Sequence, residues 1–132
     1  MLPVNKRIGI VGTRCRNTSN DLCILYKKFI ELYENGDTIV SGGCPNGADK
    51  FAEIIARRVN IPIEIYYPDK SNLDLTINPK WAYAKIAYAR NTLIADNSDI
   101  LIAMISETRK GGTEDTIKKF LKKKRVENLY LI

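Results

Sequence analysis

The sequence contains no histidine. This absence excludes zinc sites built on imidazole, and it excludes Ser-His or Cys-His catalysis, because each of these needs a histidine side chain. The cysteines, Cys15, Cys23 and Cys44, are odd in number and form no C-x-x-C pair. This pattern argues against a disulfide framework and is typical of a protein from a reducing compartment.

Long apolar runs are also missing. No stretch approaches the roughly 20 apolar residues that a membrane-spanning helix needs, and residues 1–7 lack the hydrophobic segment of a secretory signal. We therefore expect a cytoplasmic protein with no membrane partner. The length of 132 residues and the hydrophobic content of 45% predict one domain over 1–132.

The net charge of +6 is distributed unevenly along the chain. Six basic residues near the C-terminal end form what we call the lysine cluster: Lys118, Lys119, Lys122, Lys123, Lys124 and Arg125. The same predicted helix has an apolar stripe of Ile117, Phe120 and Leu121, which places the cations on the outer face. Such a run usually marks a solvated helix surface, and nucleic-acid binding is the more specific alternative.

Short apolar runs alternate with amphipathic stretches along the whole chain. Strands are predicted at 6–11, 38–41, 61–67, 100–105 and 129–132. Helices are predicted at 18–33, 48–59, 79–97 and 113–124. This alternation predicts an α/β fold: a Rossmann-like, doubly wound, mainly parallel five-stranded sheet with helices on both faces.

The segment Ser41–Asp49 joins a predicted strand to a predicted helix through a glycine-rich turn. Such a turn leaves backbone N–H groups unpaired at the positive end of the helix dipole, which suits a phosphate. It is not a Walker loop, because Ala48 and Asp49 follow its last glycine where that motif needs Lys and Ser/Thr. Taken alone, it is equally well explained as a structural turn.

Two other loops are predicted at the same edge of the sheet. The loops Gly12–Arg14, 41–49 and 106–113 all follow strands, and ligands of open parallel sheets bind beyond the carboxyl ends of the strands. We therefore expect the three loops to line one crevice, which Cys15 and Cys44 border. Glycine turns precede two of the predicted helices, and two helix N-termini in one crevice favour a ligand that carries phosphate.

Taken in order, these loops resemble the SLOG superfamily, which includes the Rossmann-like domains of Lonely Guy-type proteins, the DprA recombination mediator and the small YspA-like proteins. The resemblance spans nearly the whole chain and is closest to the YspA-like branch. It rests on Gly12, Thr13, Arg14, Ser41, Gly42, Gly43, Gly47, Ala48, Asp49, Arg90, Asn91, Asp99, Gly112 and Thr113.

The resemblance implies a crevice for nucleotides or nucleotide-derived molecules. Gly111–Thr113 would hold phosphate through backbone N–H groups, and Arg90 would reach phosphate or ribose with its planar fork. Ser41–Gly43 would approach the ligand closely, and Asp49 would cap its helix or accept from ribose hydroxyls. The residues alone leave alternatives open: Arg90 and Arg14 could form surface ion pairs, and the amide next to Arg90 could lie on a helix surface.

The sequence departs from the superfamily at one informative motif. Lonely Guy-type phosphoribohydrolases carry P-G-G-x-G-T-x-x-E, and alignment on the Gly-Thr pair puts Thr116 where the glutamate should be. Arg109 and Lys110 stand in place of the leading glycines. This departure weakens the hydrolase interpretation and favours a binding protein.

We therefore predict a protein that binds a nucleotide or a nucleotide-derived signalling molecule without a metal or another cofactor. An N-glycosidase or phosphoribohydrolase acting on nucleoside monophosphates is the first alternative, and single-stranded nucleic-acid binding is the second. Homo-oligomerisation is predicted through the helix that carries Trp81, Tyr83 and Tyr88.

Overall fold

The computed structural model describes residues 2–132. The strands are β1 (Arg7–Gly12), β2 (Thr38–Ser41), β3 (Ile63–Ile65), β4 (Ile100–Met104) and β5 (Leu129–Leu131). The helices are α1 (Ser19–Leu32), α2 (Ala48–Arg58), α3 (Pro79–Asp96) and α4 (Gly112–Lys123). Two short 3-10 turns, η1 (Lys70–Asn72) and η2 (Val126–Asn128), lie in connections for which the sequence predicts no helix or strand.

The strands form one sheet in the order β3-β2-β1-β4-β5, and every neighbouring pair is parallel. Ile8 in β1 is in register with Ile39 in β2 and Ile100 in β4. The order reverses between β1 and β4, so this is the switch point where open α/β sheets bind ligands. The predicted Rossmann-like fold is confirmed.

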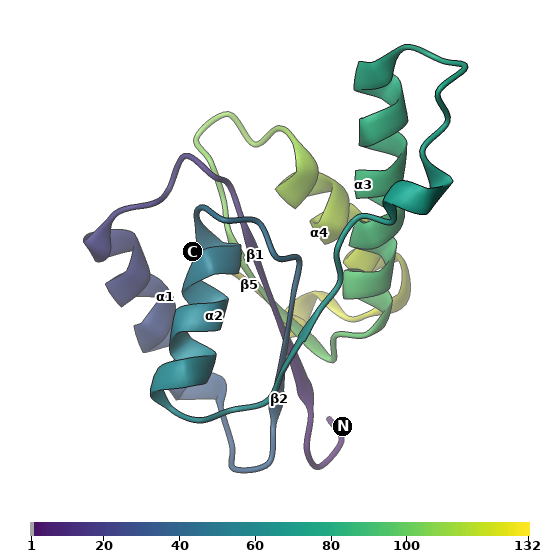
Figure 1. Ribbon diagram of the computed structural model, residues 1–132. Coiled ribbons are helices and arrows are strands. Elements are labelled where there is room, and N and C mark those ends of the chain that lie inside the picture. The colour runs from purple at the N-terminus through teal and green to yellow at the C-terminus, as the bar shows by residue number, and fades with distance from the viewer. Residues whose placement is uncertain (1) are drawn as a thin grey trace.

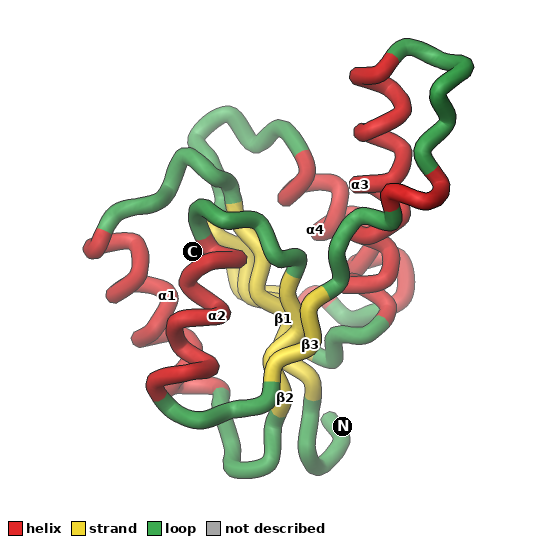
Figure 2. The backbone as a smooth tube through the Cα atoms, viewed as in Figure 1, coloured by secondary structure: helices red, strands yellow, loops and turns green. Residues whose placement is uncertain are grey.

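Each face of the sheet packs against one pair of helices, as Figures 1 and 2 show. Ile100, Ile102 and Met104 of β4 belong to the core under α1 and α2, whereas Leu101 and Ala103 belong to the core under α3 and α4. Successive side chains of a strand point to opposite faces, so a strand covered on both sides is apolar throughout. All five residues of β4 are buried, as this requires.

The lysine cluster is not uniformly solvated, which corrects the prediction that all its cations lie on an outer face. Lys119 donates to the backbone oxygen of Tyr88 at 2.6 Å, and Lys123 pairs with Asp96 at 3.1 Å. Lys124 donates to the backbone oxygen of Ser98 at 2.6 Å, just after α3 ends. These contacts join α4 to α3. Lys123 and Lys124 also lie at the C-terminal end of α4, a position that cations favour.

The N-terminal half of α3 projects from the sheet together with the loop before it (Figure 2). Trp81 and Tyr83 on this projection are 66% and 54% exposed. The predicted self-association through this helix stays a prediction. Within residues 2–132, no helix combines the length and the apolar composition needed to cross a bilayer.

A buried ion pair lies at the edge of the sheet opposite the carboxyl ends of the strands. The Lys6 ammonium lies 2.6 Å from the Asp37 carboxylate, and both side chains are almost completely buried. Lys6 also pairs at 2.9 Å with Glu34, whose side chain is 83% exposed. Because Lys6 precedes β1 and Asp37 precedes β2, the pair fixes the starts of two adjacent strands.

Replacing Asp37 with asparagine should lower the free energy of unfolding by about 3 kcal/mol, because the buried Lys6 ammonium loses its closest counter-charge. The matched variant Glu34→Gln removes the exposed partner and should cost less than about 1 kcal/mol. Urea denaturation followed by circular dichroism measures both values. Equal losses in the two variants would contradict the assignment of the Lys6–Asp37 pair as the stabilising contact.

Candidate functional site

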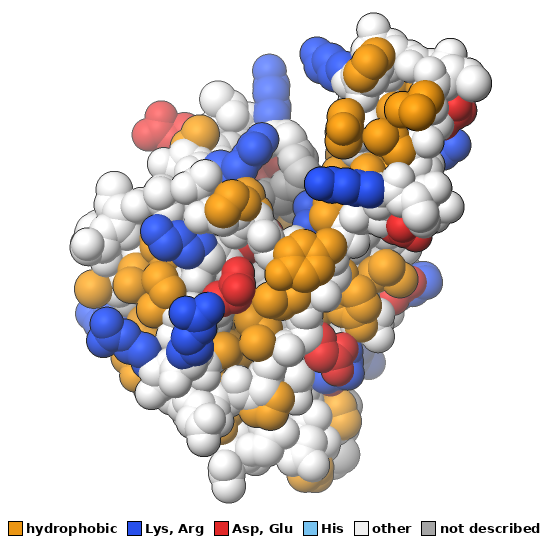
Figure 3. All heavy atoms as spheres, viewed as in Figure 1, with side chains coloured by type: hydrophobic (Ala, Val, Ile, Leu, Met, Phe, Trp, Pro, Cys, Tyr) orange, Lys and Arg blue, Asp and Glu red, His pale blue; other side chains and the backbone are white. Residues whose placement is uncertain are grey.

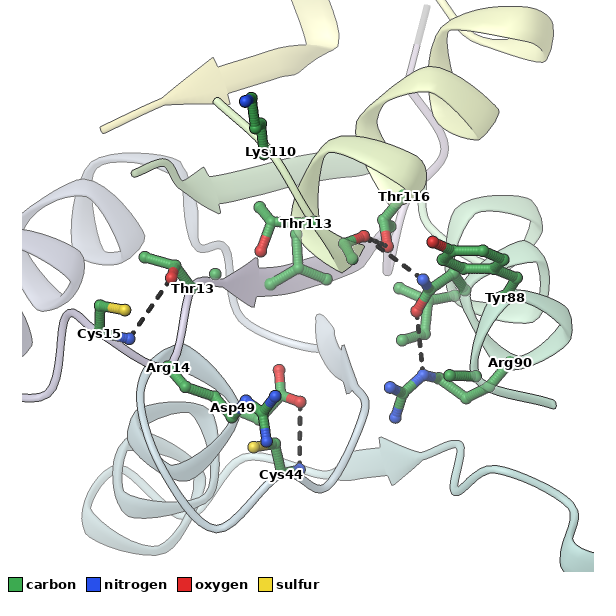
Figure 4. Close-up of a pocket in the computed structure, with 17 residues that line it drawn as sticks. Thr13, Arg14, Cys15, Cys44, Asp49, Tyr88, Arg90, Lys110, Thr113 and Thr116 are labelled. Carbon is green, nitrogen blue, oxygen red and sulfur yellow. Dashed lines mark hydrogen bonds between the residues drawn. The ribbon is translucent and has the colours of Figure 1, made fainter. Parts of the chain in front are cut away.

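A crevice of about 500 Å³ opens at the carboxyl ends of β1 and β4, at the switch point of the sheet (Figure 4). Its walls come from the loop after β1, the loop after β2, one side of α3 and the start of α4. The lining residues are Val11, Gly12, Thr13, Arg14, Cys15, Cys44, Asp49, Ala87, Tyr88, Arg90, Asn91, Ile94, Lys110, Gly111, Gly112, Thr113 and Thr116. The three predicted loops therefore meet in one crevice, as expected.

Some of the predicted site residues do not line the crevice: Ser41, Gly42, Gly43, Gly47 and Ala48. They form the supporting backbone behind it. A side chain at Gly47 would come within 2.7 Å of the Thr13 carbonyl oxygen, and one at Gly12 would come within 2.7 Å of the Ala48 side chain. The loops after β1 and β2 thus touch, and the glycines permit that close approach.

Arg90 and Asn91 tie α3 to the other walls (Figure 4). Arg90 donates from Nη1 to the Gly42 carbonyl oxygen at 2.6 Å and from Nε to the Asn91 side-chain oxygen at 3.0 Å. Asn91 donates to the Asp115 carboxylate at 3.1 Å and to the Gly112 carbonyl oxygen at 3.3 Å. Asn91 is only 5% exposed, so the alternative that it is a helix-surface amide is wrong.

The helices that begin at the crevice lack side-chain caps. The N-cap residues are Gly47 for α2 and Gly111 for α4, with φ angles of 75° and 101°, and neither supplies a capping hydrogen bond. By contrast, Thr18 caps α1 with a complete capping box, and Asn78 caps α3. An uncapped helix start leaves backbone N–H groups that an anion can satisfy.

The carboxylate of Asp49 supplies a negative charge at the positive end of the α2 dipole from within the fold. Its oxygens accept from the Cys44 backbone N–H at 3.1 Å and from the Ser41 hydroxyl at 3.3 Å. Burial raises the Asp49 pKa above its ordinary value, although the Cys44 hydrogen bond and the Arg90 charge oppose the shift. Asp49 therefore holds the loop after β2 in place, and its contact with a ribose stays a prediction.

The first turn of α4 carries the carboxylates of Glu114 and Asp115, and neither residue is part of the crevice lining. Gly111, Gly112 and Thr113 line the crevice there, and the cations Lys110 and Arg14 also belong to its lining, with Arg14 next to Asp49 (Figure 4). Within residues 2–132, neither of these cationic side chains has a hydrogen bond or an ion pair, so the surface salt bridge considered for Arg14 is not formed. The neighbouring Arg109 is different, because it pairs with Glu114 at 2.7 Å.

Apart from Cys15 and Cys44, which were expected to border the crevice, six lining residues were not among the predicted site residues: Val11, Ala87, Tyr88, Ile94, Lys110 and Thr116. Lys110 belongs to the loop 106–113 that was expected to line the crevice, and Thr116 follows the Gly111–Thr113 turn at the position of the family glutamate. Thr116 donates back to the Gly112 carbonyl oxygen at 3.1 Å. Tyr88 lies on the helix predicted for self-association, and only its position two residues before Arg90 on α3 indicates a place at the crevice.

Metal ligands are not clustered in the part of the chain that the structure describes. Within residues 2–132, no group of three or more Cys, Asp or Glu side chains is arranged to hold a metal ion. The lining residues instead offer backbone N–H groups, hydroxyls and two unpaired cations. This donor set is suited to an anionic ligand.

Comparison with known proteins gives one informative fold neighbour. The structure aligns with that of DNA processing protein A from Helicobacter pylori, a protein with a single-stranded DNA binding mode described as unique, at a TM-score of 0.65 and 23% identity. The alignment covers 97% of this chain and 65% of that chain. No family model and no curated protein sequence matches the chain. At this identity, the likeness establishes a shared Rossmann-like fold.

The raised pKa of Asp49 predicts how stability depends on pH. The unfolded carboxylate ionises near 3.8, whereas the folded one keeps its proton to a higher pH. The free energy of unfolding should therefore fall as the pH rises from 3.8 through the raised pKa, because only the unfolded state releases the proton early. Asp49→Asn should remove this fall in the free energy of unfolding, which urea titrations at a series of pH values measure. Identical pH profiles for the wild type and the variant would contradict the raised pKa of Asp49.

Proposed function

We propose that the crevice binds a nucleoside phosphate presented as one unit of single-stranded DNA. The observation that carries this proposal is the uncapped start of α4 in a crevice that is also lined by two unpaired cations, Arg14 and Lys110. A phosphate at Gly111–Thr113 would accept from the free N–H groups of the first helical turn. The cations on the flanking loops would then neutralise its charge.

The surface around the crevice supports a ligand that extends beyond it. In Figure 3, Lys and Arg side chains gather around the hollow between the main body and the projecting end of α3. Single-strand binders combine such cationic grooves with aromatic side chains, and Tyr88 supplies an aromatic ring at the wall. The fold shared with DNA processing protein A adds support for a strand as the ligand.

A free nucleotide or nucleotide-derived signalling molecule is the second candidate. The crevice volume of about 500 Å³ lies within the range of small-molecule sites and favours this ligand. Both candidates share the same phosphate contacts. The SLOG resemblance, which includes nucleotide sensors and single-strand binders, is compatible with either and remains a prediction.

Binding is a better proposal than hydrolysis of the glycosidic bond. Among the described residues that line the crevice, Asp49 alone carries a carboxylate, and its oxygens already accept two hydrogen bonds. The position that carries glutamate in phosphoribohydrolases holds Thr116, whose hydroxyl is engaged with its own helix. A general acid for glycosidic cleavage would need a carboxyl group within reach of the sugar.

The cations of the crevice should control the affinity for a strand. Arg14→Ala and Lys110→Ala should each weaken binding of a fluorescein-labelled dT oligonucleotide about tenfold, because each removes a charge-assisted contact to phosphate. Each should also reduce the slope of log K against log salt by about 0.7. Fluorescence anisotropy over a salt series measures both quantities.

Lys118→Ala and Lys122→Ala are matched controls, because they remove the same charge from exposed positions of α4 that do not line the crevice. A larger loss in these controls than in the crevice variants would move the binding surface to the lysine cluster. Competition with dTMP separates the two candidate ligands. If the protein binds dTMP as tightly as it binds longer oligonucleotides, the result would favour a free nucleotide as the ligand.

A further inference from the structure

A second cavity, of about 470 Å³, lies on the other side of α3, and we call it the side cavity. It is lined by Tyr67, Asp69, Asn72, Lys85, Ile86, Ala89, Arg90 and Leu93. Among residues 2–132, Arg90 is the one residue that lines both the crevice and the side cavity. A single guanidinium therefore stands between the two spaces, and a ligand that contacts it from the crevice is next to the side cavity.

One wall of the side cavity is the ring of Tyr67, which follows β3. Tyr67 is 63% exposed. Its ring rests against Gly43, where a side chain would collide with the ring and where φ is 75°. The ring is thus supported on one side by the loop that borders the crevice and remains open on the other. Such a supported, exposed aromatic ring can stack on a planar ligand.

A second part of the lining is an apolar strip of α3 formed by Ile86, Ala89 and Leu93. Ile86 is 4% exposed and Leu93 is 47% exposed, so the strip runs from the protein core to the solvent. Between this strip and Tyr67, the space has two apolar walls. This geometry fits a flat molecule with apolar faces.

Polar groups lie at the edges of the side cavity. Asp69 accepts from the Ser71 backbone N–H at 3.0 Å and from the Asn72 side-chain amide at 3.1 Å, and these bonds hold the η1 turn in its conformation. Lys85, by contrast, has no hydrogen bond or ion pair within residues 2–132. Its ammonium and the Arg90 guanidinium are thus the two cations that border the side cavity.

We propose that the side cavity is a nucleobase-binding subsite, which takes the base of a nucleotide adjacent to the one held in the crevice. This inference rests on the proposed function, and it commits to an oligonucleotide as the ligand. The base stacks on Tyr67 and packs against the apolar strip of α3. The phosphate that links the two nucleotides lies at Arg90, and Lys85 faces the next phosphate.

The exposed aromatic residues on the projecting end of α3 provide a comparison for Tyr67. Trp81 and Tyr83 are about as exposed as Tyr67 but line neither cavity. If any exposed aromatic residue were sufficient for binding, the three positions would be equivalent. Of these three residues, the subsite predicts that only Tyr67 contributes to oligonucleotide binding. Tyr83→Ala is therefore a matched control for Tyr67→Ala.

The test compares dTMP, measured by calorimetry, with a labelled dT oligonucleotide, measured by anisotropy. Tyr67→Ala should weaken oligonucleotide binding about tenfold, leave dTMP affinity unchanged and leave the thermal unfolding temperature close to that of the wild type. Tyr67→Phe, which keeps the ring, should retain the affinity, and Tyr83→Ala should behave like the wild type. An unchanged oligonucleotide affinity in Tyr67→Ala, with the loss still present in Arg14→Ala, would overturn the subsite and leave the proposed function standing.

Photocrosslinking gives a second readout that does not depend on affinity. An oligonucleotide with 5-iodouracil reacts on irradiation with an aromatic side chain that stacks on the base, and mass spectrometry identifies the modified residue. We expect the crosslink at Tyr67. A crosslink at Trp81 or Tyr83 alone would overturn the subsite, whereas failure of the wild type to bind either dTMP or the oligonucleotide would overturn the proposed function itself.

Discussion

Two adjacent residues of α3, Arg90 and Asn91, hold together the walls of both cavities. Arg90 reaches the carbonyl oxygen of Gly42 after β2, and Asn91 reaches the carbonyl oxygen of Gly112 at the start of α4. Both side chains are planar and carry several donors, so each can join its own helix to the backbone of another segment. The relative positions of α3, the loop after β2 and α4 depend on this junction, and the side cavity exists because α3 is held there.

The positive charge of the chain is divided between two roles. Lys119, Lys123 and Lys124 contact the C-terminal half of α3 and the residues after it, where they satisfy carbonyl oxygens and a carboxylate. Arg14 and Lys110 lie on loops at the crevice and form no such contacts in the described part of the chain. The net charge of +6 therefore does not locate a binding surface. The partners of each cation distinguish the bonded cations from the free ones, and two of the free ones, Arg14 and Lys110, line the crevice.

The helices also fall into two groups by how their N-terminal ends are capped. Thr18 and Asn78 complete the backbone hydrogen bonding of α1 and α3, which begin away from the crevice. The helices that begin at the crevice have glycine at the N-cap, so their first N–H groups depend on other partners. For α2 the Asp49 carboxylate provides the negative charge from within the fold. The first turn of α4 carries Glu114 and Asp115, which pair with Arg109 and Lys119, so the proposed ligand phosphate would be an additional anion on the crevice side.

Much of this arrangement follows from the sequence alone, because the responsible signals are local. Apolar runs and amphipathic periods fixed the order of strands and helices, and strands that alternate with helices must form a parallel sheet. The carboxyl ends of such strands share one edge, so Gly12–Arg14 and Gly111–Thr113 could be assigned to one crevice before the fold was known. The glycine turns at two helix starts could be recognised for the same reason.

The tertiary structure decided which side chains are free and which are already bonded. Arg90 and Gly42 are 48 residues apart in the chain, and Lys124 and Ser98 are 26 apart, so no local pattern predicts either hydrogen bond. The buried position of Asn91, the internal role of Asp49 and the side cavity beside Tyr67 likewise arise where distant segments pack together. The sequence by itself determined the sheet and the edge that carries the loops, because periodicity encodes burial within each element. Only packing between elements determined the partners, because hydrogen bonds and cavities form between surfaces that the chain brings together on folding.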